Sequence, residues 1–190
     1  MWWLEFVKRW RRPAGLLIVA CALGGLTAGC WQPLYGKPPG ASTDSAYDKF
    51  MMTEIPPIAA THGTPSERIA VGMFNALQFD LHGGAAVVVA PTYRLVVSVG
   101  TSQFTAVIDP NTGRANTQID SVVANYSLIE IATGKTVVSD NCFAHVDFDI
   151  PGSEQRFVKQ RAQRDAEDRA IQVAAETIRN RLASYFVAGT

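Results

Sequence analysis

Apolar residues recur at every fourth position between residues 65 and 82, and this spacing predicts an amphipathic helix. The preceding segment Thr64-Pro65-Ser66-Glu67 is typical of a helix start, because it combines a capping box with proline at the first helical position. Gly83 and Gly84 follow and predict the end of the helix. The side chains that carry the four-residue spacing, and that we expect to face the core, are Ile69, Met73, Leu77 and Leu81.

The chain behind this helix alternates apolar and polar residues, which is the pattern of half-buried strands. Residues 109–114 and 132–135 interrupt the alternation with proline and glycine, which favour turns. We therefore predict three strands, over about 85–108, 116–131 and 136–149. The positions expected to face the core are Tyr93, Leu95, Val97 and Val99 in the first of them, and Val122, Ala124, Tyr126 and Leu128 in the second.

Two further elements are predicted at the ends of this region. A short strand is expected over residues 50–58, ended by Pro56-Pro57. Pro151-Gly152-Ser153 precedes a long helix over about 154–186, with an apolar stripe that is continuous enough to cover a sheet. The stripe consists of Phe157, Ala166, Ala170, Ile171, Ala174, Ile178, Leu182 and Tyr185.

The predicted order of elements is β-α-β-β-β-α. Each element has one apolar face, so the simplest fold is an α+β two-layer sandwich with both helices packed on one face of a four-stranded mixed sheet. The helix between the first two strands makes those strands parallel, whereas the short turns make the other pairs antiparallel. This α/β domain is expected to cover residues 50–190.

The first 29 residues have the three parts of a signal peptide. A basic segment is followed by an apolar stretch of about 15 residues, shorter than the roughly 20 that a permanent membrane-spanning helix needs. Leu26-Thr27-Ala28-Gly29-Cys30 then places small residues before a cysteine, so we predict lipoprotein processing between Gly29 and Cys30 and lipidation of Cys30. An uncleaved membrane anchor is the alternative. Residues 30–49 are rich in Pro, Gly and Ser and are expected to form an extended tether.

Removal of this signal peptide changes the balance of charge. The whole chain carries 17 Lys and Arg residues and 17 Asp and Glu residues, and the signal peptide contains more basic than acidic ones. The remaining chain is therefore slightly acidic, which argues against general nucleic-acid binding. With Cys21 removed and Cys30 lipidated, Cys142 has no disulfide partner. We predict that Cys142 is a small buried side chain on a strand rather than a reactive thiol.

Short motifs are spread over the whole chain behind the signal peptide. They are Gly29-Cys30 with Pro33-Leu34-Tyr35-Gly36, Tyr93-Arg94-Leu95, Ala124-Asn125-Tyr126-Ser127-Leu128 with Thr133-Gly134-Lys135, Arg164-Asp165-Ala166 and Leu182-Ala183-Ser184-Tyr185-Phe186. Together they resemble the LPS-assembly lipoprotein LptE family, in particular its alphaproteobacterial members. The chain departs from that pattern at Trp31-Gln32, where related proteins carry glycine and an aromatic residue.

The resemblance implies a lipoprotein of the outer membrane that faces the periplasm and plugs the lumen of the LptD β-barrel. It also implies that the protein helps this barrel to assemble and contacts lipopolysaccharide on its way to the cell surface. The implied partners are therefore the barrel, lipopolysaccharide, and the membrane through acyl chains such as palmitate on Cys30; no cofactor and no enzymatic activity is expected. The alternatives are an auxiliary lipoprotein of an ABC-type lipid transport system and, less favoured, a lipoprotein enzyme.

One group of residues resembles a metal site. Strand alternation would place His145, Asp147 and Asp149 on one face, as metal ligands require. We favour a solvated strand face opposite Val146 and Phe148, so neither a metal site nor a catalytic residue is predicted.

A basic cluster is the other candidate. Arg156 and Lys159 open the last helix, where positive charges oppose the helix dipole, and the predicted topology places Arg114 at the same end of the sheet. Because arginine and lysine bind phosphate groups, we predict that these three residues contact lipopolysaccharide. The alternative is an ordinary solvated face. Lys135 is expected at the opposite end, where the tether enters.

The second face of the sheet also carries a prediction. Val96, Ile119, Val123 and Ile129 are expected there, and together they are more apolar than a solvated face needs. This favours a face that another protein covers.

Overall fold

The computed structural model describes residues 45–188 except for 85–89, 112, 114 and 151–155. These residues belong to one compact unit of the chain, and the predicted signal peptide, Cys30 and most of the tether lie outside them. The elements are α2 (Ala46–Met51), β1 (Thr53–Glu54), α3 (Pro65–His82), β2 (Tyr93–Ile108), β3 (Ala115–Glu130), β4 (Thr136–Asp149) and α4 (Arg156–Ala188).

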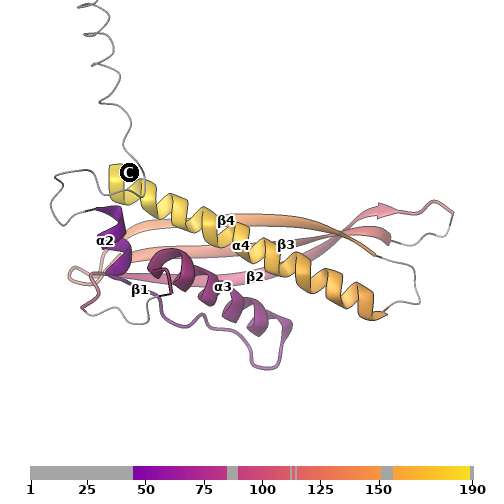
Figure 1. Ribbon diagram of the computed structural model, residues 1–190, viewed down its shortest axis with the longest axis horizontal. Helices are drawn as coiled ribbons and strands as arrows, with labels where there is room; N and C mark the ends of the chain where they lie inside the picture. The colour runs from indigo at the N-terminus through magenta and orange to yellow at the C-terminus, as the bar shows by residue number, and fades with distance from the viewer. Residues whose placement is uncertain (1–44, 85–89, 112, 114, 151–155, 189–190) are drawn as a thin grey trace, which may run out of the picture. The chain divides into compact units, whose positions relative to one another are not determined.

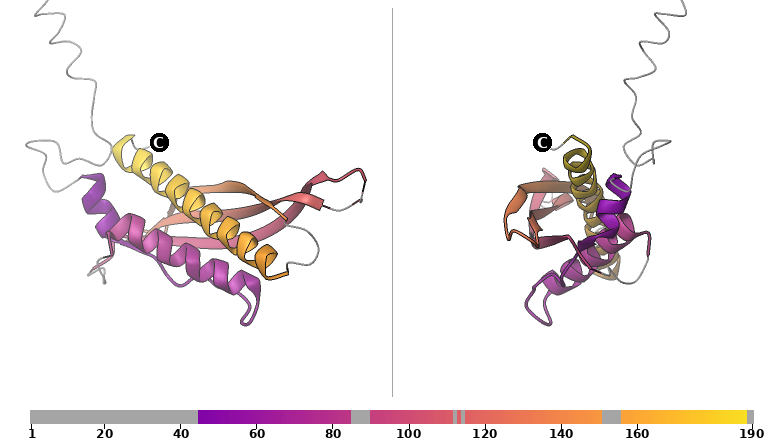
Figure 2. Two further views of the ribbon diagram at one scale, coloured as in Figure 1. Left: turned by 45° about the vertical axis from the view of Figure 1, so that its right-hand side comes forward. Right: turned by 90° about the vertical axis from the view of Figure 1, so that its left-hand side faces the viewer.

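The domain has two layers, as Figure 1 shows. The four strands form one sheet in the order β1-β2-β3-β4, with β1 parallel to β2 and the other pairs antiparallel. Helix α4 packs along β4 and β3, and α3 lies beside α4 and contacts β2, so both long helices cover the same face (Figure 2). The predicted α+β sandwich with a mixed four-stranded sheet is confirmed.

The strand register defines the two ends of the sheet. Ile108 pairs with Ala115 and Thr117 pairs with Asp149, so the β2–β3 turn lies at the end where β4 finishes and α4 begins. This end is termed the distal end. At the opposite, proximal end, Tyr93 pairs with both Thr53 of β1 and Glu130 of β3, next to the turn that contains Lys135. The prediction that the β2–β3 turn lies at the end of the sheet where β4 finishes, from which the position of the basic cluster was inferred, is therefore confirmed.

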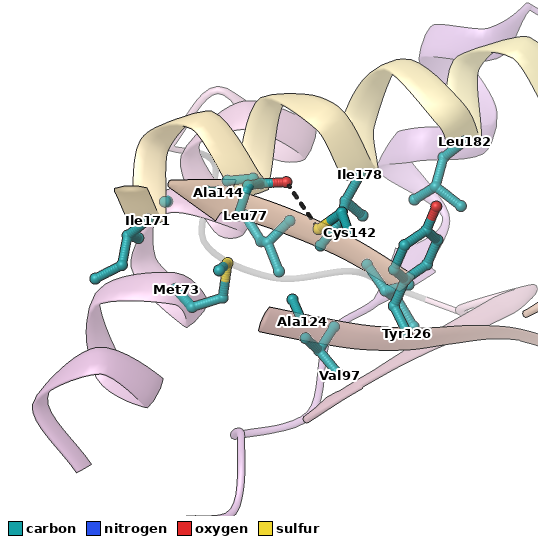
Figure 3. Close-up of a cluster of buried hydrophobic side chains, with 14 of the residues drawn as sticks. Met73, Leu77, Val97, Ala124, Tyr126, Cys142, Ala144, Ile171, Ile178 and Leu182 are labelled. Atoms are coloured by element: carbon teal, nitrogen blue, oxygen red, sulfur yellow. Dashed lines mark hydrogen bonds between the residues drawn. The ribbon is translucent and has the colours of Figure 1, made fainter. Parts of the chain in front are cut away.

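The core fills the space between the sheet and the long helices (Figure 3). The alternation predicted for the strands is correct, because Leu95, Val122 and Leu128 are fully buried. Helix α4 contributes small residues, and a Cβ atom added at Gly72 of α3 would meet Cδ1 of Ile171 at 2.9 Å. The helices therefore approach each other and the sheet closely. The alanines that α4 buries are Ala166, Ala170, Ala174, Ala175 and Ala183.

The predicted first strand is mostly wrong. Only Thr53–Glu54 pairs with β2, and Ala46–Met51 forms α2, so residues 46–49 of the expected tether belong to a helix. Ser45 begins this helix, because its side chain accepts a hydrogen bond from the amide of Asp48. The strand is short because Pro56-Pro57 follows it and proline has no amide hydrogen for a sheet ladder.

The predicted helix over 65–82 and its glycine end are confirmed, but its capping box is not. The side chain of Thr64 donates to the carbonyl oxygen of Thr61 at 2.6 Å and makes no cap hydrogen bond to the helix. Glu67 instead forms a hydrogen bond with the ring of His62 at 2.8 Å and accepts another from the amide of Gly63 at 2.7 Å, and these two hydrogen bonds lower the pKa of Glu67. The helix ends at Gly83, which has a positive φ of 61°.

The last helix begins and ends close to its predicted bounds, but one residue of its stripe is misplaced. Phe157 is 82% exposed, whereas Ala166 and Ile178 are fully buried. The apolar spacing continues into the first turns of α4, but burial begins further along the helix. A local pattern therefore overestimates the length of helix that the core covers.

Candidate functional site

The structure separates the two faces of β4 as the sequence predicts. Val146 and Phe148 are buried, whereas His145, Asp147 and Asp149 are exposed on the other side of the strand. Asp149 accepts a hydrogen bond from Thr117 at 3.0 Å, and His145 stacks on Phe143. Within the described residues, no group of three His, Cys, Asp or Glu side chains is arranged to hold a metal ion.

Cys142 lies on the buried face of β4, as predicted. Its side chain is 5% exposed, and the thiol lies 3.8 Å from the carbonyl oxygen of Ala174 in α4 (Figure 3). Burial is the main cause that raises the pKa of Cys142 above its usual value. The thiol is thus held in the form that is neither nucleophilic nor a metal ligand.

The other face of the sheet is not covered by any element of the described chain, and we term it the open face. Val96, Ile119, Val123 and Ile129 belong to it, as predicted, because each lies next to at least one buried residue that faces the other side of the sheet. The sequence reasoning missed its two aromatic residues, Phe104 and Phe143, which are 55% and 59% exposed. Strand alternation would have found them. The rows across β2, β3 and β4 are Phe104, Ile119 and Asp147; Ser102, Ser121 and His145; Gly100, Val123 and Phe143; Ser98, Asn125 and Asn141; and Val96, Ser127 and Ser139.

A shallow hollow of about 390 Å³ lies over the polar part of this face. The hydroxyl groups of Ser127 and Ser139 lie 3.3 Å apart on this face. Asp140 borders the hollow, but its side chain is directed to the helical side, where it forms an ion pair of 3.7 Å with Arg181 of α4. The open face therefore combines exposed aromatic rings with uncharged hydroxyl and amide groups. The residues that line the hollow are Val96, Ser98, Asn125, Tyr126, Ser127, Ser139, Asp140 and Asn141.

The predicted basic cluster falls only partly on the described residues. Lys159 is half-buried near the start of α4, whereas Arg114 and the side chain of Arg156 lie outside the described part of the chain. Large apolar side chains are exposed on the distal segments; the sequence pattern had placed one of them, Phe157, in the buried stripe and had not singled out the others. The sequence signal for these exposed residues is the presence of two adjacent apolar pairs, Val107-Ile108 and Phe157-Val158. The exposed apolar residues of these segments are Val107, Ile108, Phe157 and Val158.

The proximal end is closed by an aromatic cluster where the chain enters the domain. The ring of Phe186, near the end of α4, lies 5.4 Å from that of Phe50 in α2 and 5.2 Å from that of Tyr93 in β2. Lys49 donates a hydrogen bond to the carbonyl oxygen of Phe186 at 3.4 Å. Helix α2 is thereby attached to the last turns of α4, at the end where the tether was predicted to enter.

The comparison with solved structures identifies the fold. The chain resembles a proposed lipoprotein from Caulobacter crescentus with a TM-score of 0.57 and 18% identity, covering 75% of this chain and 96% of that one. It also resembles rare lipoprotein B from Shewanella oneidensis with a TM-score of 0.51 and 15% identity, covering 71% of this chain and 96% of that one. The shared property is the fold.

No protein-family model and no curated protein matches the chain. None of the helices in the described residues combines the length and the apolar character of a membrane span.

Proposed function

We propose that this protein is a lipid-anchored lipoprotein of the outer membrane that faces the periplasm and plugs an LptD-like β-barrel. In this role it helps the barrel to assemble and contacts lipopolysaccharide during its transport to the cell surface. The observation that carries the proposal is the open face, a broad sheet surface that no described element covers. The similarity in fold to two proteins named as lipoproteins and the predicted lipidation of Cys30 support it.

The composition of the open face fits a protein-covered surface. A solvated face of an antiparallel sheet is usually polar, yet Phe104 and Phe143 are both more than half exposed. Ser98, Asn125 and Asn141 add a row of uncharged polar groups next to them. The interior of a transmembrane β-barrel is polar, so a plug needs hydroxyl and amide groups of this kind on its surface.

The distal end fits an anionic amphiphile. Exposed Phe157 and Val158 lie one or two residues from Lys159 on α4. A phosphate-bearing glycolipid carries both acyl chains and negative charge, so apolar and basic side chains together suit it. We propose that Lys159, with Arg114 and Arg156, contacts lipopolysaccharide at this end. Alanine substitution of these three residues should weaken lipopolysaccharide binding by the purified protein, and unchanged affinity would contradict this assignment.

The anchor is part of the same proposal. Each buried CH₂ group of an acyl chain contributes about 0.8 kcal/mol, so two or more chains on Cys30 would hold the protein stably at a membrane. The finer assignment to alphaproteobacterial members of the family rests on the sequence motifs alone. Neither catalysis nor a cofactor forms part of the proposal.

The test is a detergent pull-down of the tagged full chain from its own outer membranes, followed by mass spectrometry. We expect a large β-barrel protein in stoichiometric amount. A Phe143→Ser substitution on the open face should reduce this recovery, whereas Phe79→Ser, at a ring on α3 that is 68% exposed, should leave it unchanged. Recovery of inner-membrane transporter subunits instead would favour the role of an auxiliary lipoprotein in ABC-type lipid transport.

A further inference from the structure

A second hollow, of about 210 Å³, lies on the opposite side of the sheet from the open face, where the helical layer meets β2 and β3. It is lined by Pro65 at the start of α3, residues 101–103 of β2, residues 120–122 of β3, and Gln163 and Glu167 of α4. Pro65 and residues 101–103 are exposed. The hollow is therefore accessible from the β2 side.

Buried polar residues are concentrated at this hollow. Among the described residues, six polar or charged ones are buried, and the side chains of two of these, Asp120 and Glu167, lie on the side of the sheet where the hollow is. Asp120 and Glu167 are 5% and 7% exposed. Burial of a carboxylate costs free energy unless hydrogen bonds and an opposite charge compensate for it. The partners of each carboxylate therefore decide what the hollow can bind.

Glu167 is compensated within the protein. It forms an ion pair with Arg68 of α3 and accepts a hydrogen bond from Gln163 at 2.9 Å. Arg68 also pairs with Asp168 at 2.8 Å, on the outer side of α4. Arg68 therefore already forms ion pairs with two carboxylates, those of Glu167 and Asp168.

Asp120 is compensated only in part. Its Oδ1 accepts a hydrogen bond from the side-chain amide of Gln103 at 2.8 Å, whereas its Oδ2 is buried without a hydrogen-bond partner in the described chain. Burial raises the pKa of Asp120 more than this hydrogen bond lowers it. The side-chain oxygen of Gln118, two residues earlier on the same face of β3, is also buried without a partner. Gln118 is not among the residues that line the hollow, so the acceptor that lacks a donor there is Oδ2 of Asp120.

We propose that this hollow receives the cationic side chain of an arginine or lysine from a protein partner. A guanidinium or ammonium group carries donors and no acceptor, so it complements the Oδ2 atom of Asp120, which lacks a donor. Its positive charge balances the carboxylate that Arg68 does not neutralise, and a charge-assisted hydrogen bond is stronger than a neutral one. Buried arginine anchors of this kind are common in the centres of protein interfaces.

The site lies on the opposite side of the sheet from the open face, so it can be tested separately from the proposed function. The probe is the peptide acetyl-Gly-Arg-Gly-amide, titrated into the purified full chain in detergent while the carboxyl carbon of Asp120 is followed by NMR. We expect a saturable shift. The matched peptide with citrulline, which has the shape of arginine without its charge, should bind about tenfold more weakly or less.

Two variants locate the site. Asp120→Asn should reduce the affinity for the arginine peptide, followed by backbone amide shifts, by about tenfold or more. Asp140→Asn removes an exposed carboxylate from β4 and should leave the affinity unchanged. Gln163→Tyr, which fills the hollow without changing its charge, should abolish binding while circular dichroism shows an intact fold.

Three outcomes would overturn the proposal. The first is the absence of a saturable shift, which would mean that only water occupies the hollow. The second is equal affinity of the wild-type chain and the Asp120→Asn variant. The third is tighter binding of free ethylammonium than of the arginine peptide, which would indicate a site for a small amine rather than for a partner's side chain.

Discussion

The Nε2 atom of His82, in the last turn of α3, donates a hydrogen bond to the carbonyl oxygen of Thr53 in β1 at 2.9 Å. The other ring nitrogen contacts the side-chain amide of Gln78 at 2.7 Å. His82 is 5% exposed and Thr53 is fully buried. This contact joins the end of α3 to the short strand at the proximal end of the sheet.

We expect His82→Ala to lower the free energy of unfolding by about 1–3 kcal/mol, because it leaves the buried carbonyl group of Thr53 without a donor. Urea denaturation at neutral pH measures this change. His62→Ala is the matched control, since the His62 side chain is 95% exposed and solvent screens its contact with Glu67. An equal effect of the two substitutions would contradict the role assigned to His82.

The aromatic cluster at the proximal end gives a second prediction. Phe186→Ala should lower the free energy of unfolding by about 3–5 kcal/mol, because it leaves a cavity between α2, β2 and the end of α4. Phe157→Ala removes the same ring from a position that is 82% exposed and should change stability by less than about 0.5 kcal/mol. Thermal and urea unfolding of both variants would compare the two positions, and a small loss for Phe186→Ala would show that α2 is not held by this cluster.

A third prediction concerns the thiol of Cys142. In a chain with Cys30 replaced by serine, folding should slow the reaction of Cys142 with a thiol reagent at pH 8 by a factor of roughly 100 or more. Burial shields the sulfur, and its raised pKa keeps the thiol protonated at this pH. A Ser139→Cys substitution, at an exposed position of the same strand, should react rapidly. Comparable rates at the two positions would contradict the buried placement of Cys142.

The raised pKa of Asp120 predicts a dependence of stability on pH. Because the folded state holds the proton of this carboxyl more tightly than the unfolded state, Asp120 lowers stability progressively as pH rises through its unfolded and then its folded pKa. We therefore expect Asp120→Asn to unfold at higher urea concentration than the wild-type chain at pH 7. The advantage should disappear below the unfolded pKa of about 3.9. An Asp140→Asn control should not show this pH-dependent gain.

Most of the regular elements could be predicted from the sequence because their signals are local. The four-residue spacing and the flanking proline and glycines located α3, and period-two alternation assigned the buried positions of β2 and β3. The elements that were missed depend on distant contacts. Helix α2 is short, and Phe50 packs on Phe186, which is far away in the sequence, so the residues around Phe50 resemble a strand as much as a helix.

The candidate site could be predicted only in part for the same reason. Alternation assigned Val96 and Val123 to the open face, but their pairing with residues on neighbouring strands requires the register. The ion pairs between residues that are distant in the sequence could not be predicted from local patterns either. Asp168 pairs with Arg68, which lies 100 residues earlier in the chain. An ion pair between two helices depends on how these helices pack, and no spacing within one helix encodes it.

Local patterns in the sequence were sufficient to predict α3, β2, β3, β4 and α4 in their order, most of the positions that face the core, and the lipoprotein motif that ends at Cys30. Each of these follows from neighbouring residues, through helical or strand periodicity or through a contiguous motif. The packing of distant elements brings Asp120 and Glu167 to one hollow and pairs Glu167, but not Asp120, with Arg68. The reason is physical: the state of a buried charge depends on the groups that surround it in space, and here these groups come from α3, α4, β2 and β3.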